Sequence, residues 1–472
     1  MLGIILLSVL GFVLIMLTVM TYYLHGVAKQ VEADAEAGMD VEKKKEEVSS
    51  SQGFVYTALV LVSVGMAAAL YIYVRGTAWE AHLMEWMNIV VRLMHITFGI
   101  AWIGASFYFV FLENALNRTR DVRDELAGNL WAVHGGGFYY LEKYKVAPKT
   151  IPKHLHWFKY EAYFTWVTGF CLLFVVYYFN ASALLIDKNV LDISPLTGVS
   201  IGVGSFIVAW ILYDLLCKSP LIKKPFWFAL IGFAILVGFA YFYSRVFSAR
   251  AGYIHFGAMI GSIMVANVFF VIIPAQKAMV KAAKNGLPLN PQLGKNALSR
   301  SLHNNYFTLP VLFVMISNHF PTTFGYEQPW LILAIISLGT AGVKHYLNLR
   351  EKGQLSIWIL PVSIVILLAG AFISAPPKDP GACNTRIDFS EVNAIIQERC
   401  VSCHSSKPTD DVYKAAPNGV MYDTPDDIVR KKDLIMQRVV VTKTMPQNNK
   451  TNITQKERDI IRCWIEQGAL VR

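Results

Sequence analysis

The stretch "RCVSCHSSK", residues 399–407, has the residue types and spacing of a redox site. Cys400 and Cys403 are two residues apart, and His404 follows directly. Cys-x-x-Cys-His is the attachment signature of c-type haem, because two thiols one helical turn apart can add to the porphyrin's vinyl groups while the adjacent imidazole binds the iron. A thioredoxin-like thiol pair would need a βαβ context, and a zinc site would need a second ligand pair. The sequence around the motif has no βαβ pattern, and the chain has no second Cys-x-x-Cys. The motif predicts one covalent haem c.

The sixth iron ligand is expected to be a methionine downstream of the motif. Met445 lies in "KTMPQNN", where Pro446 ends regular structure and the polar neighbours leave no core for a methionine to fill. Met421 is in a loop close to the motif, and Met436 falls on the apolar side of a predicted helix. We predict Met445 as the ligand, with Met421, Met436 and an open or water-bound position as alternatives.

Two further cysteines, Cys383 and Cys463, flank the motif. The terminal helices of small cytochromes c pack together, so these cysteines could meet, and an oxidising compartment would permit a disulfide. Two separate structural thiols are the alternative. Cys171 and Cys217 lie in apolar segments and are expected to be packing residues.

The chain before this region has the composition of a polytopic membrane protein, with 54% hydrophobic and 16% charged residues and a mean hydropathy of +0.42. Stretches of roughly 18 or more apolar residues predict membrane spans. Ten segments qualify: 2–24, 54–74, 86–112, 158–180, 199–217, 226–243, 252–273, 302–320, 328–346 and 356–374.

Lys and Arg collect in alternate loops, after the first, third, fifth, seventh and ninth predicted spans. Short basic loops resist translocation, so this pattern places both termini outside the cytoplasm. The net charge of +10 is therefore expected to reflect membrane topology and not a nucleic-acid surface.

A Pro/Gly-rich break, "ISAPPKDPGACNT", marks a domain boundary near residue 375. We predict three parts. Residues 1–78 form an extension with two spans and a charged cytoplasmic linker, 79–375 form an eight-span membrane domain, and 376–472 form a cytochrome c domain in the periplasm. The fold class is all-α: a polytopic helix bundle of about 8 to 10 spans with a C-terminal class I cytochrome c domain.

Placing an ionisable residue inside a membrane span costs free energy, so such residues are functional candidates. His95, His255 and His319 all fall toward the outer half of the predicted bundle. Imidazoles from facing helices can ligate a b-type haem, so these three are candidate haem b ligands. The alternative is that each imidazole bonds a backbone carbonyl or reaches the membrane interface.

The cytoplasmic loop between the third and fourth spans is about 45 residues long. It contains His134 followed by three glycines, then aromatic and basic residues, then His156 and Glu161. Glycine lets backbone amides approach a ligand, and histidine, lysine and aromatic rings suit a flat, anionic, nitrogen-rich molecule. We predict His134, His156 and Glu161 as catalytic residues. An interfacial aromatic belt with a glycine turn is the alternative.

The segments "RLMHITFGIAWIGASFYFVFLENAL", "WAVHGGGFYYLEKYK" and "HLHWFKYEAYFTWVTGF" resemble the bacterial membrane-bound urate hydroxylases (urate oxidases) of the PuuD type. The resemblance covers residues 80 to 472. It implies an inner-membrane oxidoreductase that converts urate to 5-hydroxyisourate and passes electrons through a haem c to a soluble cytochrome c or terminal oxidase. The alternatives are a non-enzymatic, membrane-anchored cytochrome c subunit of a respiratory complex, and a transporter or sensor with a redox-reporting tail.

Overall fold

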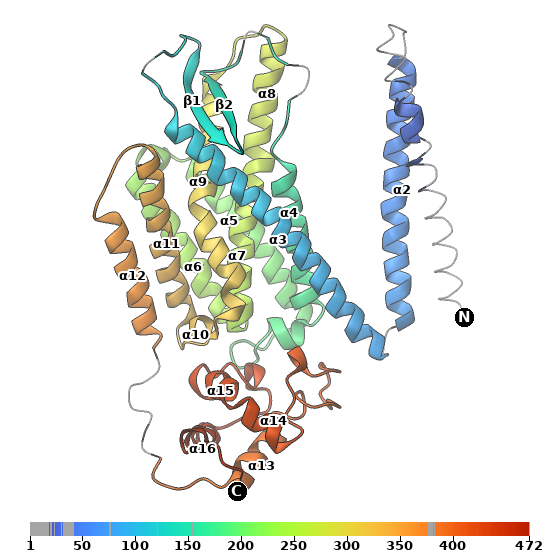
Figure 1. Ribbon diagram of the computed structural model, residues 1–472, viewed down its shortest axis with the longest axis vertical. Helices are drawn as coiled ribbons and strands as arrows, with labels where there is room; N and C mark the ends of the chain where they lie inside the picture. Colours follow the sequence, from blue (N-terminus) through green and yellow to red (C-terminus); the bar gives the residue numbers. More distant parts are fainter. Residues whose placement is uncertain are drawn as a thin grey trace. The chain divides into compact units, whose positions relative to one another are not determined.

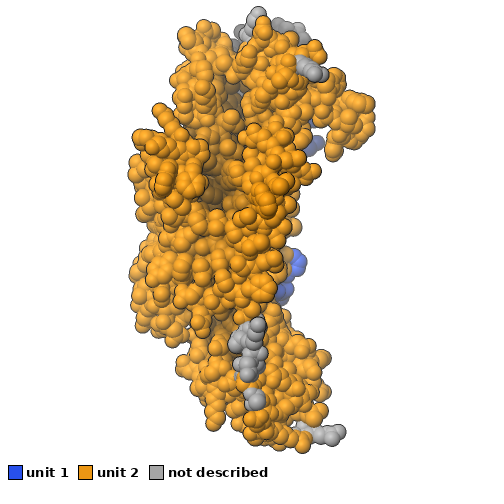
Figure 2. All heavy atoms as spheres, turned by 90° about the vertical axis from the view of Figure 1, so that its left-hand side faces the viewer, with its two compact units in different colours: residues 1–86 blue, residues 87–472 orange. Residues whose placement is uncertain are grey.

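The computed structural model describes residues 18, 21–22, 24–29, 31, 42–74, 77–119, 121–148, 150–152, 155–375, 381 and 383–471. The chain forms two compact units, residues 1–86 and residues 87–472, coloured separately in Figure 2. The first unit contains α2 (Glu42–Val74) and the start of α3 (Ala78–Ala115). The predicted span 2–24 lies largely outside the described residues.

The second unit contains a bundle of long helices that run side by side (Figure 1). Its helices after α3 are α4 (Tyr160–Leu172), η1 (Leu173–Tyr178), η2 (Ala181–Leu185), α5 (Pro195–Lys218), η3 (Pro220–Lys223), α6 (Pro225–Val246), α7 (Ala249–Ala266), η4 (Asn267–Ile272), α8 (Ile273–Lys284), α9 (Pro291–Ile316), η5 (Ser317–His319), α10 (Pro321–Phe324), α11 (Pro329–Glu351) and α12 (Ile359–Ile373).

Seven helical segments of the described chain are long and apolar enough to cross a membrane: Phe54–Val74, His82–Ala115, Tyr160–Tyr178, Pro195–Lys218, Pro225–Val246, Ala249–Lys284 and Pro329–Glu351. The predicted spans 302–320 and 356–374 are also helical, as α9 and α12, but do not reach this standard. Helix α12 has only 15 residues, and α9 carries buried polar residues such as Arg300 and Asn305.

The bundle buries a polar network as well as apolar side chains. Arg300 of α9 donates to Asp214 of α5 at 2.6 Å and to Asn267 of η4 at 3.2 Å. The Asn267 amide donates to Asn304 at 2.8 Å and to the Tyr213 hydroxyl at 3.1 Å. Partnered polar groups of this kind can stay inside an apolar bundle, which explains how Arg300 and Asn304 of α9 are buried there.

The loop between α3 and α4 contains an antiparallel β-hairpin, which the all-α prediction missed. Strand β1 (Leu126–His134) pairs with β2 (Gly137–Tyr144), and His134 stands opposite Gly137 at the last pair. The turn residues Gly135 and Gly136 have φ of 57° and 80°. Two consecutive left-handed residues are the requirement of a tight hairpin turn, so two of the three glycines serve the turn.

The C-terminal module is helical and has its own core. It comprises α13 (Phe389–Arg399), η6 (Pro417–Gly419), α14 (Pro425–Arg430), α15 (Lys432–Ile435), η7 (Met436–Val441), η8 (Gln447–Asn449) and α16 (Gln455–Glu466). Val392, Ile396, Ile428 and Trp464 pack at its centre. Thr454 caps the last helix, because its side chain accepts a hydrogen bond from the Glu457 amide.

A disulfide between Cys383 and Cys463 joins the segment before α13 to α16, with Cα atoms 5.3 Å apart. The structure therefore pairs the two flanking cysteines and leaves Cys400 and Cys403 as free thiols. In Figure 1 the β-hairpin lies at one end of the bundle and helices α13–α16 lie at the other.

Candidate functional sites at the two ends of the bundle

The two cysteines of the C-terminal motif lie in the turns that follow α13. The amides of Cys403 and His404 both donate to the Cys400 carbonyl, at 3.2 and 2.9 Å, so the helical path continues for one turn past the helix end. Cys400 is 8% exposed, and burial raises the pKa of its thiol to about 12. Burial, and then the nearby Asp410, raise the pKa of Cys403 as well. Both sulfurs are neutral thiols at neutral pH.

The His404 ring is oriented by a backbone carbonyl. Its Nδ1 atom lies 2.9 Å from the Val420 oxygen. A carbonyl only accepts, so the ring proton is on Nδ1 and the lone pair is on Nε2. Burial lowers the pKa of His404, which keeps the ring neutral. Histidine ligands of metals commonly have this arrangement.

The three candidate methionines have different surroundings. Met445 packs against the core of the module, while its amide donates to the Arg438 carbonyl at 3.0 Å and its carbonyl accepts from Arg458 at 2.9 Å. Met421 is 38% exposed, and Met436 begins η7. Two free thiols, a neutral imidazole and a backbone-anchored methionine are a donor set that fits haem c.

His95 of α3 faces α4. Its Nδ1 lies 3.0 Å from the Thr165 carbonyl and 3.2 Å from the Thr168 hydroxyl. A Cβ atom built on Gly169 would lie 2.8 Å from the ring's Cε1, so the ring occupies the place of a side chain there. The bond to the carbonyl leaves Nε2 of His95 with a lone pair.

His255 of α7 is fully buried between α5 and η1. Its Nδ1 lies 2.9 Å from the Ala251 carbonyl, and its Nε2 lies 3.0 Å from the Tyr178 hydroxyl. His319 ends η5 and is exposed. His95 and His255 therefore share the tautomer of His404, although a ligand at His255 would have to replace the Tyr178 contact.

The residues predicted as catalytic lie at the hairpin end of the bundle. His134 is exposed at the hairpin tip, where its strand ends. His156 and Glu161 come together, with Nε2 4.0 Å from Oε1. The second oxygen of Glu161 is buried and has no hydrogen-bond partner. The structure thus brings together two of the three predicted residues and places the third at the turn.

A cavity of about 890 Å³ lies between α3, the hairpin, η4, α8 and α9, and its lining includes neither His156 nor Glu161. Phe158 lines it, and the Phe158 ring lies edge-on to the His156 ring with centroids 4.5 Å apart. Its charged lining residues are Glu113, Arg118, Lys143 and Lys352, three cations and one carboxylate, which gives a net charge of +2. Such a cavity favours an anion.

Glu113 bonds two of the three cations that line the cavity. Its carboxylate bonds Arg118 at 3.0 Å and also bonds Lys143 of β2. Asn304 lines the cavity from α9 and belongs to the buried network of Asn267 and Arg300. The cavity wall is therefore fixed both by the hairpin and by the bundle interior.

A family model described as urate oxidase N-terminal matches residues 81–375. The chain belongs to this family. No curated protein and no solved structure matches the chain. Membership in the urate oxidase N-terminal family supports a urate-related function and an oxidoreductase, and the matched range contains the hairpin, the cavity and the bundle.

Several residues that line this cavity were not among the site residues predicted from the sequence. Lys143 lies in the basic loop after the third predicted span, and this loop was used only to infer the membrane topology. Gln276, Ser301 and Asn304 belong to no sequence motif that indicates a site. Glu113 was recognisable as an ionisable residue at the inner end of a span. The cavity assembles from five separate elements, so no single stretch of sequence displays it.

Proposed function

We propose that the protein is a membrane-bound urate hydroxylase. Urate and one water molecule give 5-hydroxyisourate, two protons and two electrons, and the electrons leave through a covalent haem c to the respiratory chain. Molecular oxygen is neither incorporated into the product nor reduced at the site. The observation that carries the proposal is the cationic cavity inside the part of the chain that matches the urate oxidase N-terminal family.

The cavity supports a urate site by its size and charge. Its volume of about 890 Å³ falls within the range of roughly 300–1,000 Å³ of small-molecule pockets. Urate is an anion at neutral pH. The two positive charges of Lys143 and Arg118 are only half neutralised by the Glu113 carboxylate that both of them contact. Phe158 and Trp102 offer ring faces or edges to a flat purine.

Proton removal falls to His156 and Glu161 in this proposal. His156 contacts Phe158 of the cavity wall, and the Glu161 carboxylate lies 4.0 Å from its imidazole. A neutral imidazole can accept a proton from urate or from the attacking water, and a carboxylate beside it stabilises the imidazolium. His134, at the hairpin turn, remains a predicted catalytic residue.

Electrons must travel from the hairpin end of the bundle to the module at the other end (Figure 1). The hydrocarbon core of a bilayer is about 30 Å thick, so a carrier inside the bundle is needed. We propose a b-type haem, which would supply one-electron transfer, held by a pair of imidazoles from His95, His255 and His319. Cys400, Cys403, His404 and Met445 would hold haem c. The module would face the periplasm of a bacterial inner membrane, where a soluble cytochrome c or terminal oxidase accepts the electrons.

Anaerobic turnover with isotopically labelled water tests the reaction. Purified protein, urate and an oxidised cytochrome c as acceptor should give 5-hydroxyisourate whose new hydroxyl carries the water oxygen. Formation of hydrogen peroxide, or a requirement for oxygen, would contradict the proposal. Absence of any urate oxidation without a second polypeptide would favour the electron-transfer subunit.

A further inference from the structure

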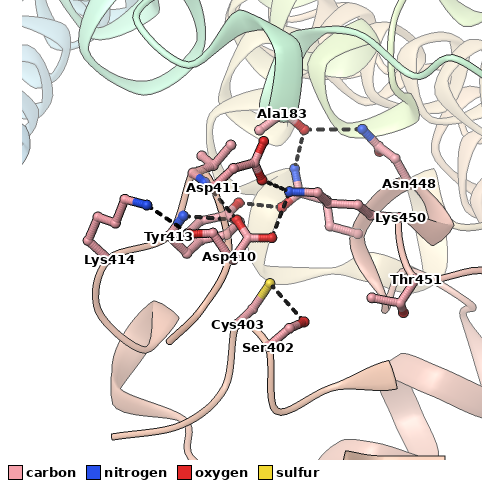
Figure 3. A network of polar contacts seen from close by, with 12 residues as sticks. Ala183, Ser402, Cys403, Asp410, Asp411, Tyr413, Lys414, Asn448, Lys450 and Thr451 are labelled. Carbon is pink, nitrogen blue, oxygen red and sulfur yellow. Dashed lines mark hydrogen bonds and ion pairs between the residues drawn. The ribbon is translucent and has the colours of Figure 1, made fainter. Parts of the chain in front are cut away.

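The loop that carries Met445 is hydrogen-bonded to the membrane domain. The Gln447 amide donates to the Ala183 carbonyl at 2.7 Å, and the Asn448 amide donates to the Ala183 and Ile186 carbonyls at 3.1 and 2.8 Å. The Asn189 amide donates to the Asn448 carbonyl at 3.1 Å. Figure 3 shows the Asn448 side chain directed at Ala183. Four hydrogen bonds thus connect one short loop with the segment around η2.

A second contact lies on the other side of Met445. A Cβ atom on Gly325, between α10 and α11, would lie 2.6 Å from the Thr442 carbonyl oxygen and 2.9 Å from the Thr444 methyl carbon. No larger residue fits there without displacing the loop. The membrane domain therefore contacts the chain three residues before Met445 and three residues after it.

The same loop is anchored inside the C-terminal module. The Gln447 oxygen accepts from the Tyr413 hydroxyl at 2.6 Å. Asn448 and Asn449 have φ of 52° and 49°, a left-handed conformation that asparagine tolerates better than most residues. Gln447 therefore uses both ends of its amide, one toward each domain, and its position fixes the loop relative to both.

We propose that Gln447 and Asn448 are positioning residues that hold the Met445 loop against the membrane domain, so that methionine ligation of the haem iron depends on the contact between the two domains. The inference rests on the proposed function, because it requires haem c and Met445 as its ligand. The inference also indicates how electrons would pass through the module. The side that carries Met445 would receive electrons from the bundle, and a soluble acceptor would bind to another side.

Isosteric variants of the full-length protein test this inference. Asn448→Asp replaces the donor that faces two carbonyls with an acceptor, and Gln447→Glu removes the donor to Ala183 but retains the acceptor for Tyr413. Asn449→Asp is the matched control, because the Asn449 amide donates to Ile453 within the module at 3.3 Å. The readout is the rate at which added imidazole replaces methionine on the ferric haem, followed by the far-red absorption band of methionine-ligated iron.

Gln447→Glu should exchange the methionine about fivefold faster than the wild type, since losing one ordinary hydrogen bond corresponds to about that factor. Asn448→Asp loses two hydrogen bonds to the membrane domain and should exchange it faster still. Both variants should also have a lower haem reduction potential, while Asn449→Asp stays close to the wild type. Equal exchange rates and potentials in all four proteins would overturn the inference but leave haem c and urate oxidation intact. A wild type without covalent haem would overturn the proposed function and this inference together.

Discussion

The Nδ1 atom of His404 lies 2.9 Å from the carbonyl oxygen of Val420, sixteen residues further along the chain. This bond fixes the lone pair on Nε2, the nitrogen that would bind the iron of the proposed haem. The amide of Tyr422 in turn donates to the His404 carbonyl at 2.9 Å, so the two segments hold each other in register. The proximal side of the predicted haem is therefore organised by backbone contacts.

The distal ligand can be assigned by a pair of methionine substitutions. Met445→Leu should abolish the far-red band of methionine-ligated ferric haem and lower the reduction potential, because leucine offers no donor to the iron. Met421→Leu is the control, since Met421 is 38% exposed and outside the module's core. Absorption spectroscopy and a redox titration measure both. If Met421→Leu removes the band and Met445→Leu keeps it, the assignment is reversed.

Urate binding in the cavity can be tested by substituting one of the cations that line it. Lys143→Met should raise the KM for urate about 10- to 100-fold, the loss expected for one hydrogen bond to a charged group, with a smaller effect on kcat. Lys145→Met is the matched control, because Lys145 lies just beyond the end of β2, donates to the Asp124 carbonyl at 2.6 Å and does not line the cavity. Steady-state kinetics measure both. Equal KM values in the two variants would place urate elsewhere.

The place of His255 in the bundle can be tested through its neighbouring glycine. A Cβ atom on Gly202 would lie 3.0 Å from Nε2 of His255 and 2.9 Å from the Tyr178 oxygen, whereas one on Gly204 would meet nothing within 4 Å. Gly202→Ala should therefore destabilise the bundle by about 1–3 kcal/mol through overpacking. If His255 holds a b-type haem, the variant should also lose b-type haem in a pyridine haemochrome assay. Gly204→Ala should change neither; b-type haem unchanged in Gly202→Ala would remove His255 from the ligand pair.

Several of these features follow from the sequence by local physical rules. The spacing of Cys400, Cys403 and His404 predicts a haem c site, and Thr454 followed three residues later by Glu457 predicts the start of α16. Apolar length predicts most of the helices that are long and apolar enough to span a membrane. Each of these signals is contained within a few turns of the chain.

Other features depend on contacts that no local signal encodes. The sequence left open whether Gly135 and Gly136 approach a ligand or form a turn, and the pairing of β1 with β2 shows that they form a hairpin turn. The lining of the cavity comes from distant segments, as does the contact between Asn448 and Ile186, 262 residues apart. Predicting them requires knowing which faces of which helices meet.

Acidification provides a test of the network beside Cys403 (Figure 3). Asp410 bonds Lys450 at 2.6 Å and accepts from the Val412 and Tyr413 amides, and despite its burial these bonds lower its pKa to about 2. Because the unfolded value is about 3.9, the stability from this carboxylate is present above about pH 4 and is lost as the pH falls toward 2. Asp410→Asn should unfold more easily at pH 7, by about 1–3 kcal/mol, and should lose part of this pH dependence.

Asp411→Asn is the control for that experiment. Asp411 also bonds Lys450, but its side chain is 79% exposed, and an exposed ion pair contributes little to stability. Near-ultraviolet circular dichroism during thermal unfolding, repeated from pH 2 to pH 7, measures both variants. Equal unfolding curves for the two variants at pH 7 would contradict the role assigned to Asp410.

The most direct test of the account is to mix urate with the oxidised, full-length protein under anaerobic conditions and record the haem c absorption. Urate alone should reduce haem c, and Lys143→Met should require more urate to do so. If dithionite reduces the haem and urate does not, the protein does not carry electrons from urate to its C-terminal module, and the central claim is wrong.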